Sequence, residues 1–475
     1  MQTWRAILQN IWQSAWGYQA LLLILSAITS FMLWHFDHQT LSVYSVQQLW
    51  QSALMPETLW QQVLHPFSGE EHRVILLMGL LSSVSLGLFA AVSLLLGLSR
   101  QTTLVLVLLM NFNPEYNDVR LSLDVFQLII PLWLLGLWGL LTYYAHHRLK
   151  ALGLWTGCWL LGVILEPATL LVGLGFPCCF AVLEHKVSKT WGMWWLGYAL
   201  LAGLFVLLLP HTREFVVQWW ASLSHTKPDA SSYFFPLGDG RSLSLSALQY
   251  YGLALVLVLF NWARCAGLVI VGLVLVGLRA KVTSVLVPRI RYFLWFGLLF
   301  MALLLSFLWV HMGRWFGDLA YMPLVMVGLL LTSGAVFYSL ERMRRLSDVQ
   351  RLVLFWLGVS YALASMMSFG PSAGHLREAG LWTHHHLATF EQSALPQKLL
   401  YSNSPQALFY AGVSPLERDE HYRLDVLSDD LPSDALILYS HYRHAPLPED
   451  FKRFETLAKF TNQHGDQIYA LRSSP

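Results

Sequence analysis

Asp37 is the first residue of the chain that could do acid–base chemistry, because it stands where the first long apolar run ends in Trp34-His35-Phe36. Ionisable groups at the edge of a bilayer are costly and usually functional. A carboxylate there can act as the general base that activates a hydroxyl or amine. A solvated aspartate at a helix end is the alternative. His35 and His38 are three residues apart on one helix face, which leaves a metal site as a third interpretation.

A second group of charges lies in the segment Glu115-Tyr116-Asn117-Asp118-Val119-Arg120, which follows a short apolar run that stops at Asn113-Pro114. A short helix would leave this loop recessed below the membrane rim, where irregular polar backbone is tolerated mainly if it lines a cavity. Arg120 could hold a phosphate there, and Glu115 and Asp118 could hold a divalent cation. An ordinary turn is the alternative interpretation.

Three more charged residues stand at predicted outer helix ends. Glu166 lies between two apolar runs, directly before Pro167. Arg264 and Arg314 lie at the outer ends of later runs, against the usual bias of basic residues towards the cytoplasm. Arginine presents a planar fork that matches phosphate, so a lipid-phosphate headgroup would explain them. Snorkelling of their side chains to ordinary headgroups is the alternative.

Composition predicts the elements that must position these residues. Hydrophobic residues make up 56% of the chain and charged residues 12%, about half the charged fraction of soluble proteins. The mean hydropathy is +0.50, and several apolar runs reach the roughly 20 residues that span a bilayer. We therefore expect an α-helical polytopic membrane domain over residues 1–369. Its eleven predicted spans are 18–36, 73–98, 102–113, 123–144, 151–165, 168–183, 192–210, 262–278, 292–310, 317–338 and 352–369.

The run 247–278 is too long for one ordinary span and is interrupted by Asn261-Trp262-Ala263-Arg264. We interpret it as an interfacial or partly inserted helix followed by a span, with its exact number of crossings left open. The polar segment 211–246 contains an amphipathic piece and a turn signal, Gly238-Asp239-Gly240.

Charge alternation orients the chain. Basic residues gather in every second turn and loop carboxylates on the opposite side, so the amino terminus is predicted to be cytoplasmic and the carboxy terminus outside. The first outer loop, 37–72, carries two predicted interfacial helices, 41–54 and 57–65. No cleavage site follows the first run, which we interpret as a retained helix.

The last part of the chain, 370–475, is polar and alternating, which predicts a small extracytoplasmic α/β domain. Its strands are expected at Lys398–Ser402, Ala435–Tyr439 and Gln467–Leu471, with a helix at Leu447–Phe460. The four cysteines form no disulfide or metal pattern. His384-His385-His386 has no partner ligands in the sequence, so no metal is required. The net charge of +2 argues against nucleic acid as a partner.

The layout resembles the class C (GT-C) membrane glycosyltransferases, such as the protein O-mannosyltransferases and the lipid A aminoarabinose transferases. Four features carry the resemblance: Asp37 ending the first span, the two interfacial helices after it, the acidic loop 113–120, and the segment Leu395–Tyr410, which looks like the family's opening outer strand and helix. His38 departs from the adjacent Asp-Glu that is common in the family.

The resemblance implies an inner-membrane enzyme of bacteria that moves a sugar from a polyprenyl-phosphate donor to a glycan, lipid or protein acceptor on the outer face. It places the general base on Asp37 and the donor phosphate on the outer arginines. Glu115, Asp118 and Glu166 form a second acidic site. A transporter or flippase of a lipid-linked intermediate, and a non-catalytic scaffold or sensor, remain as alternatives.

Overall fold

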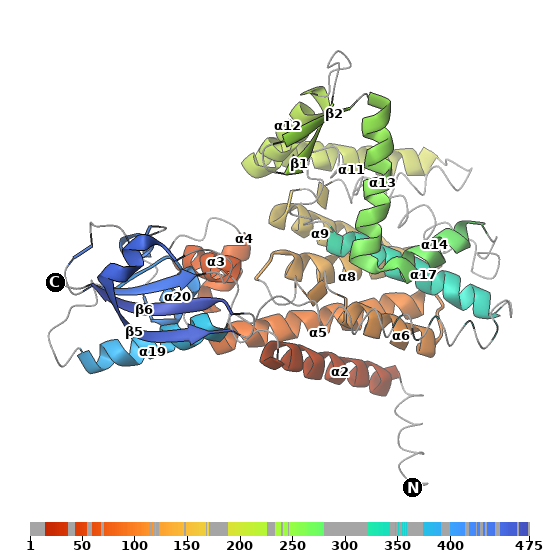
Figure 1. Cartoon of the computed structure of the whole chain (residues 1–475). Coiled ribbons are helices and arrows are strands. Elements are labelled where there is room, and N and C mark those ends of the chain that lie inside the picture. Colours follow the sequence, from red (N-terminus) through yellow and green to blue (C-terminus); the bar gives the residue numbers. More distant parts are fainter. Residues whose placement is uncertain are drawn as a thin grey trace, which may run out of the picture. The chain divides into compact units, whose positions relative to one another are not determined.

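The computed structural model describes most of the chain (Figure 1). The described residues are 15–36, 43–54, 59–67, 71–113, 116, 117, 119, 123–146, 149–167, 169, 170, 189–225, 233–238, 241–245, 247–279, 322–342, 347, 350, 354, 356, 358, 374–390, 400–413, 418–423, 425–427, 431, 432, 435–441, 447–462 and 465–473. They form two compact units. Unit 1 comprises 1–26, 81–119 and 125–367, and unit 2 comprises 27–80, 120–124 and 368–475.

Apolar helices build unit 1, and most of them begin and end close to the predicted spans. They are α6 (Arg100–Asn111), α8 (Phe126–His146), α9 (Leu149–Leu165), α11 (Lys189–Leu208), α12 (Pro210–His225), α13 (Ala247–Ala266), α14 (Leu268–Arg279) and α17 (Met322–Arg342). Two long helices, α2 (Ala15–Phe36) and α5 (Glu71–Leu95), run through the division between the units. The predicted spans 168–183, 292–310 and 352–369 lie wholly or mostly outside the described residues.

Three described helices are long and apolar enough to cross a membrane: Arg73–Leu95, Phe126–Tyr143 and Pro323–Arg342. A fourth crossing is added if Leu196–Leu208 and Pro210–Val217, which meet at 104°, are counted as one broken span. The chain is thus a polytopic helical membrane protein, and its total of eleven spans stays a prediction.

Small residues allow the helices of unit 1 to pack closely, as is usual in membranes. A Cβ atom on Gly139 of α8 would stand 2.8 Å from the carbonyl oxygen of Ala151 on α9. One on Gly334 of α17 would stand 2.3 Å from Leu106 of α6. The hairpin of α8 and α9 therefore depends on glycine at position 139, whereas the close contact at Gly334 is with the flexible end of the Leu106 side chain.

The break in the long run 247–278 differs from the prediction. α13 continues through Asn261–Arg264, and the chain turns at Gly267, whose φ is +88°, before α14 begins (Figure 1). Polar side chains do not by themselves end a helix, and Asn261 is fully buried on α13. A positive φ is costly for every residue except glycine. Gly267 is the single residue between the two helices, and it therefore sets the position of the break.

The polar segment after α12 contains a β-hairpin that we did not predict. Strands β1 (Tyr233–Gly238) and β2 (Arg241–Leu245) pair antiparallel, with Gly238 opposite Arg241. The predicted turn signal Gly238-Asp239-Gly240 falls between the two paired strands, and its last two residues lie outside the described residues.

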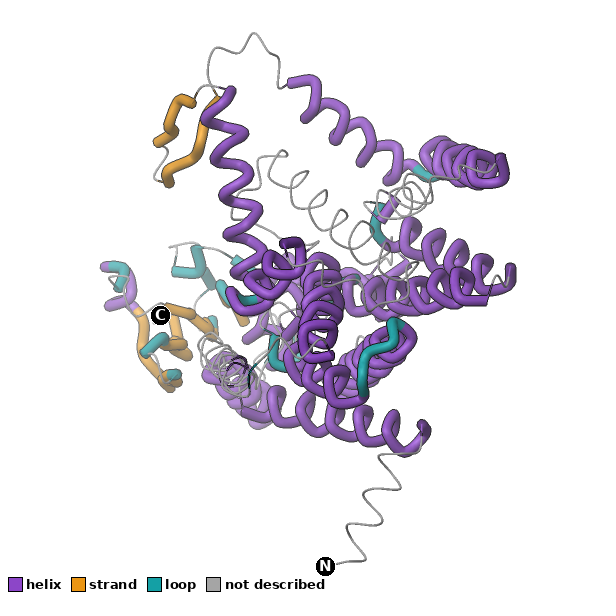
Figure 2. The backbone as a smooth tube through the Cα atoms, turned by 90° about the vertical axis from the view of Figure 1, so that its right-hand side faces the viewer, coloured by secondary structure: helices purple, strands orange, loops and turns teal. Residues whose placement is uncertain are grey.

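Unit 2 combines the first outer loop with the carboxy-terminal residues. The loop forms α3 (Val43–Leu54), α4 (Leu59–Leu64) and a 3₁₀ turn η1 (His65–Phe67), which confirms its two predicted helices. A four-stranded sheet follows in the order β3 (Leu400–Ser402), β4 (Leu436–His441), β6 (Gln467–Ser473) and β5 (Phe454–Thr461). Strand β3 is parallel to β4, and the other pairs are antiparallel. The sheet and the β1–β2 hairpin are the strand regions in Figure 2.

The three predicted strands of this sheet are confirmed, but the predicted helix Leu447–Phe460 is wrong. Only Glu449–Arg453 is helical, as a 3₁₀ turn (η7), and Phe454–Thr461 is strand β5. Ala458 and Phe460 are half-buried and two residues apart, the period of a strand, and a bulge between Thr456 and Ala458 interrupts the pattern before them. Pairing with β6 satisfies the backbone of this segment, and such long-range pairing is invisible to local helix propensity.

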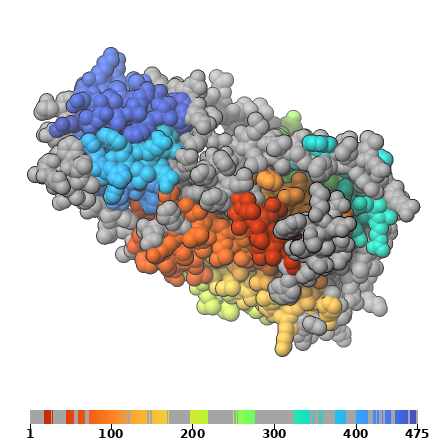
Figure 3. All heavy atoms as spheres, turned by 90° about the horizontal axis from the view of Figure 1, so that it is seen from below, coloured from red at the N-terminus to blue at the C-terminus, as the bar shows by residue number. Residues whose placement is uncertain are grey.

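A further helix that we did not predict, α19 (Gly374–Phe390), packs against β5, β6 and the short helix α20 (Pro405–Tyr410). α19 and the last strands are contiguous on the face that Figure 3 shows, in light and dark blue. α20 begins at the N-cap Ser404, whose hydroxyl accepts from the backbone N–H of Ala407. The predicted opening strand and helix of the outer domain thus correspond to β3 and α20.

Gly380 is the closest contact between α19 and α20, and its replacement by alanine should destabilise unit 2. A Cβ atom there would stand 2.5 Å from Cβ of Tyr410 and 2.7 Å from the carbonyl oxygen of Ala407. Forcing such contacts costs about 1–3 kcal/mol, so we expect an apparent Tm several degrees lower in detergent. Gly79→Ala on α5 is the matched control, because nothing lies within 4 Å of its new Cβ atom. Equal Tm values for the two variants would contradict the packing argument.

Candidate active site

The structure describes only part of the site that the sequence predicts. Asp37, Glu115, Asp118, Arg120 and Arg314 lie outside the described residues, as does His38. Glu166 and Arg264 lie inside them, together with Asn113, Tyr116, Asn117 and Val119 of the acidic loop.

The described residues of the acidic loop 113–119 are buried and fixed by hydrogen bonds to three helices. Asn113 Nδ2 donates to the carbonyl oxygen of Cys265 at 2.6 Å, and the Tyr116 hydroxyl donates to the carbonyl oxygen of Ser82 at 2.9 Å. Gln127 Nε2 donates to the carbonyl oxygen of Val119 at 2.8 Å. The loop is therefore bound to α13, α5 and α8.

These contacts are consistent with the predicted recess of the loop, whose depth in the membrane stays a prediction. α6 has 12 residues, which span only about 18 Å of the roughly 30 Å hydrocarbon core. Ser82, which holds Tyr116, stands eleven residues (roughly 17 Å) into α5 from Glu71. Buried polar backbone needs protein partners, and Asn113, Tyr116 and Asn117 are at most 2% exposed.

The hydrogen bond from Asn113 brings the acidic loop next to a predicted phosphate-binding residue. Its acceptor, Cys265, directly follows Arg264. Arg264 lies in the last turn of α13 and its side chain is exposed. Two features that are 150 residues apart in sequence thus meet at one place in unit 1. The role of Asn113 was missed, although an Asn-Pro pair that ends an apolar run could have signalled a fixed loop.

An apolar cavity of about 110 Å³ begins directly after Cys265. Residues of α6, α14 and α17 line it, with Ala266 and Gly267 at the helix break. Its polar hydroxyls belong to Thr102 and Ser333, and each is already hydrogen-bonded, to Ser99 and to the carbonyl oxygen of Leu330. The cavity therefore suits a hydrocarbon rather than a sugar.

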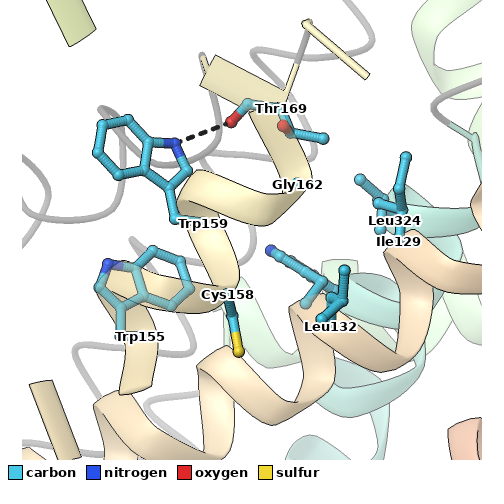
Figure 4. Close-up of a pocket in the computed structure, with 9 residues that line it drawn as sticks. Ile129, Leu132, Trp155, Cys158, Trp159, Gly162, Thr169 and Leu324 are labelled. Atoms are coloured by element: carbon cyan, nitrogen blue, oxygen red, sulfur yellow. Dashed lines mark hydrogen bonds between the residues drawn. The ribbon is translucent and has the colours of Figure 1, made fainter. Parts of the chain in front are cut away.

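Glu166 is held by its own turn at the end of α9. Its backbone N–H donates to the carbonyl oxygen of Gly162 at 2.8 Å, and its carbonyl oxygen accepts from the Thr169 hydroxyl at 2.9 Å. Trp159 Nε1 donates to the carbonyl oxygen of Thr169 at 3.2 Å, as Figure 4 shows. A cavity lined by Trp159, Gly162 and Thr169, but not by Glu166, measures about 20 Å³, roughly the space of one water. It is too small for a sugar or a phosphate.

The first outer loop is hydrogen-bonded to the residues that follow the acidic loop. In unit 2, Trp60 Nε1 donates to the carbonyl oxygen of Leu123 at 2.9 Å. The backbone N–H of Leu123 donates to Ser45 Oγ at 3.1 Å. Leu123 stands three residues after Arg120 in the sequence. Helices α3 and α4 are therefore joined to the second predicted loop, a contact that sequence periodicity could not indicate.

Within the described part of the chain, no three His, Cys, Asp or Glu residues gather as they would around a metal ion. His384 Nδ1 contacts the carbonyl oxygen of Ala411 at 3.2 Å, and His386 stacks on Trp382 with ring centroids 4.4 Å apart. His384 thus contacts the residue that follows α20, and His386 packs within α19 itself. On β4, burial and then the Asp425 carboxylate raise the pKa of Tyr439, so this phenol is neutral at physiological pH.

Asn113→Asp should loosen the acidic loop, because it replaces the Nδ2 donor by an oxygen facing the carbonyl oxygen of Cys265. Leaving a buried polar group without its partner costs about 1–3 kcal/mol, so we expect a lower apparent Tm in detergent. Gln62→Glu makes the same amide-to-acid change on an exposed residue of α4 and should leave the Tm unchanged. An unchanged Tm in Asn113→Asp would contradict the anchoring role.

Comparison with known proteins places this architecture. No protein-family model and no curated protein matches the sequence. Among solved structures, the chain is similar to ArnT from Cupriavidus metallidurans, which was crystallised bound to undecaprenyl phosphate. The sequences are 14% identical, the TM-score is 0.51, and the match covers 96% of this chain and 98% of ArnT. The resemblance to class C membrane glycosyltransferases is therefore confirmed for the fold, over nearly the whole chain.

Proposed function

We propose that this protein is a membrane glycosyltransferase that moves a sugar from a polyprenyl-phosphate donor to an acceptor on the outer face of the membrane. The shared fold supports this, because ArnT has the same architecture end to end and binds undecaprenyl phosphate. The proposal extends that ligand class to this chain, with the donor's sugar and the acceptor unassigned.

The observation that carries the proposal is the junction of the acidic loop with the end of α13. A polyprenyl phosphate has an anionic headgroup on a hydrocarbon chain. The junction offers Arg264 for the headgroup and, beginning two residues later, an apolar cavity of about 110 Å³ for part of a chain. A guanidinium beside an apolar cavity at the membrane edge is the pairing that such a ligand needs.

In the proposed reaction Asp37 is the general base. It takes the proton of the acceptor hydroxyl or amine while the acceptor's electron pair attacks the anomeric carbon. The bond from that carbon to the phosphate oxygen breaks, and the phosphate leaves with the bonding electrons. Arg264, Arg314 and Arg120 stabilise the developing charge on the phosphate. Glu115, Asp118 and Glu166 form a second acidic site that orients the acceptor or holds a divalent cation.

Transfer of radiolabelled sugar tests the function directly. Purified protein in bilayer nanodiscs would receive polyprenyl-phosphate sugars together with an extract of cell-envelope acceptors, with and without EDTA. Time-dependent label on an acceptor is the expected result, and its loss in EDTA would assign the cation. Movement of labelled donor across the bilayer without any transfer would favour a flippase and overturn the proposal.

The carboxy terminus is expected to lie outside the cytoplasm, as the charge alternation of the loops predicts. Alkaline phosphatase fused after Pro475 should therefore be active, and a fluorescent protein that folds only in the cytoplasm should be dark at the same position. The reverse pattern would remove every outer-face assignment made above. A fusion within the basic loop after Arg342 is the matched inside control.

A further inference from the structure

A three-membered cluster in unit 2 joins the end of the first outer loop to the outer domain. Glu71 is the first residue of α5, Arg377 lies in the first turns of α19, and Tyr410 is the last residue of α20. Arg377 Nη2 lies 3.1 Å from Glu71 Oε2, and the Tyr410 hydroxyl donates to Glu71 Oε1 at 2.9 Å. The Arg377 guanidinium lies 5.7 Å from the centroid of the Tyr410 ring. Every pair in the cluster is therefore in contact.

This cluster is partly buried, unlike an ion pair on the protein surface. The side chain of Glu71 is only 14% exposed, and that of Arg377 is 35% exposed. Both carboxylate oxygens of Glu71 are engaged, and a carboxylate at a helix N-terminus is favoured by the helix dipole. Exposed pairs contribute little because solvent screens them, whereas partial burial strengthens this one.

The two partners of Glu71 lie on helices α19 and α20 of the carboxy-terminal domain (370–475), which we call the outer domain, and these helices are packed closely together. α19 and α20 touch at Gly380, where no space exists for a Cβ atom. α20 also packs against α3 of the first outer loop. The outer domain therefore contacts the loop at two places: α3, and Glu71 where the loop ends. Asp37 opens the same loop in the sequence.

We infer that Glu71 is a positioning residue: through Arg377 and Tyr410 it fixes the end of the first outer loop on the carboxy-terminal domain, an arrangement that sugar transfer requires. The inference rests on the proposed function. It makes the outer domain part of the transfer reaction, because α19 and α20 supply the support. Glu71 itself touches neither the sugar nor the phosphate.

A double-mutant cycle tests the assignment. Glu71→Gln and Arg377→Gln should each lower kcat for sugar transfer about tenfold with little change in the KM for donor. Their combination should lose little more than either alone, because both remove the same ion pair. A tenfold coupling corresponds to about 1.4 kcal/mol. Losses that simply multiply, or a rise in donor KM with unchanged kcat, would overturn the positioning role.

A reversed pair, Glu71→Arg with Arg377→Glu, should regain part of the lost turnover. Arg453→Ala is the matched control, because Arg453 forms an exposed ion pair with Asp450 at 3.2 Å elsewhere in the outer domain. It should leave kcat unchanged. Equal losses in Arg453→Ala would show a general effect of charge rather than positioning.

A distance measurement separates this inference from the proposed function, because it needs no activity. Spin labels would be attached to cysteines at Gln51 on α3 and Glu378 on α19, both exposed, after replacement of the four native cysteines. The distance distribution should be narrow in the wild type and at least twice as broad in Glu71→Gln. A narrow distribution in both proteins would overturn the positioning role of Glu71. A broadened distribution in Glu71→Gln, in a protein without transferase activity, would preserve the positioning role and refute the proposed function alone.

Discussion

Replacing Asp37 by asparagine is expected to lower sugar transfer about 10²–10⁴-fold, the usual loss when a general base is removed. Asparagine keeps the shape and most of the hydrogen bonding of aspartate but cannot accept the acceptor's proton. Folding and donor binding should therefore survive. The measurement is transfer of labelled sugar from lipid donor to acceptor, with donor binding measured separately on the same preparations.

Asp450→Asn makes the same change on a half-exposed carboxylate of the outer domain and should transfer sugar at the wild-type rate. Near-wild-type transfer by Asp37→Asn would refute the assignment of the base. Glu115, Asp118 and Glu166 would then be the residues to test. Of these three, only Glu166 lies in the described part of the chain, in the turn that ends α9.

Replacing Arg264 by alanine should give the second largest loss, about 10²–10³-fold in kcat/KM for donor, as when a charge-stabilising group is removed from an active site. Arg264→Lys should recover only part of it, because lysine lacks the bidentate fork. The alternative role of Arg264 is to stabilise the carboxyl-terminal end of α13, which is worth about 0.3–1 kcal/mol. The two roles predict different readouts: loss of transfer in one case and only a small change in Tm in the other.

Arg213 on α12 is the matched control, because it is an exposed arginine predicted on the same side of the membrane. Arg213→Ala should leave kcat/KM unchanged. If Arg264→Ala behaves like Arg213→Ala, the phosphate contact belongs to Arg314 or Arg120 instead. The junction of the acidic loop with α13 would then be structural only.

The sequence by itself determined the features that depend on local composition and period. Apolar runs of sufficient length located α2, α5, α8, α9, α11 and α17, because a bilayer requires helices of about that length and hydrophobicity. Three- and four-residue spacing located α3 and α4. Alternation located β3, β4 and β6.

The tertiary structure decided the features that depend on distant partners. Residues Phe454–Thr461 form strand β5 because they pair with the edge of β6, although the local sequence pattern favours a helix over these residues. The chain turns at Gly267 rather than at the polar residues before it, because Asn261 is accommodated in the protein interior and only glycine adopts the required φ.

The candidate site likewise has features that the sequence predicted and contacts that only the structure revealed. Residue type and position at helix ends were enough to select Asp37, the acidic loop and Arg264, because ionisable groups at a membrane edge are rare. Which of these features meet could not be predicted, because residue spacing carries no information about contacts between segments that are far apart in the sequence. Only the folded chain joins Asn113 to Cys265, Trp60 to Leu123 and Glu71 to Arg377.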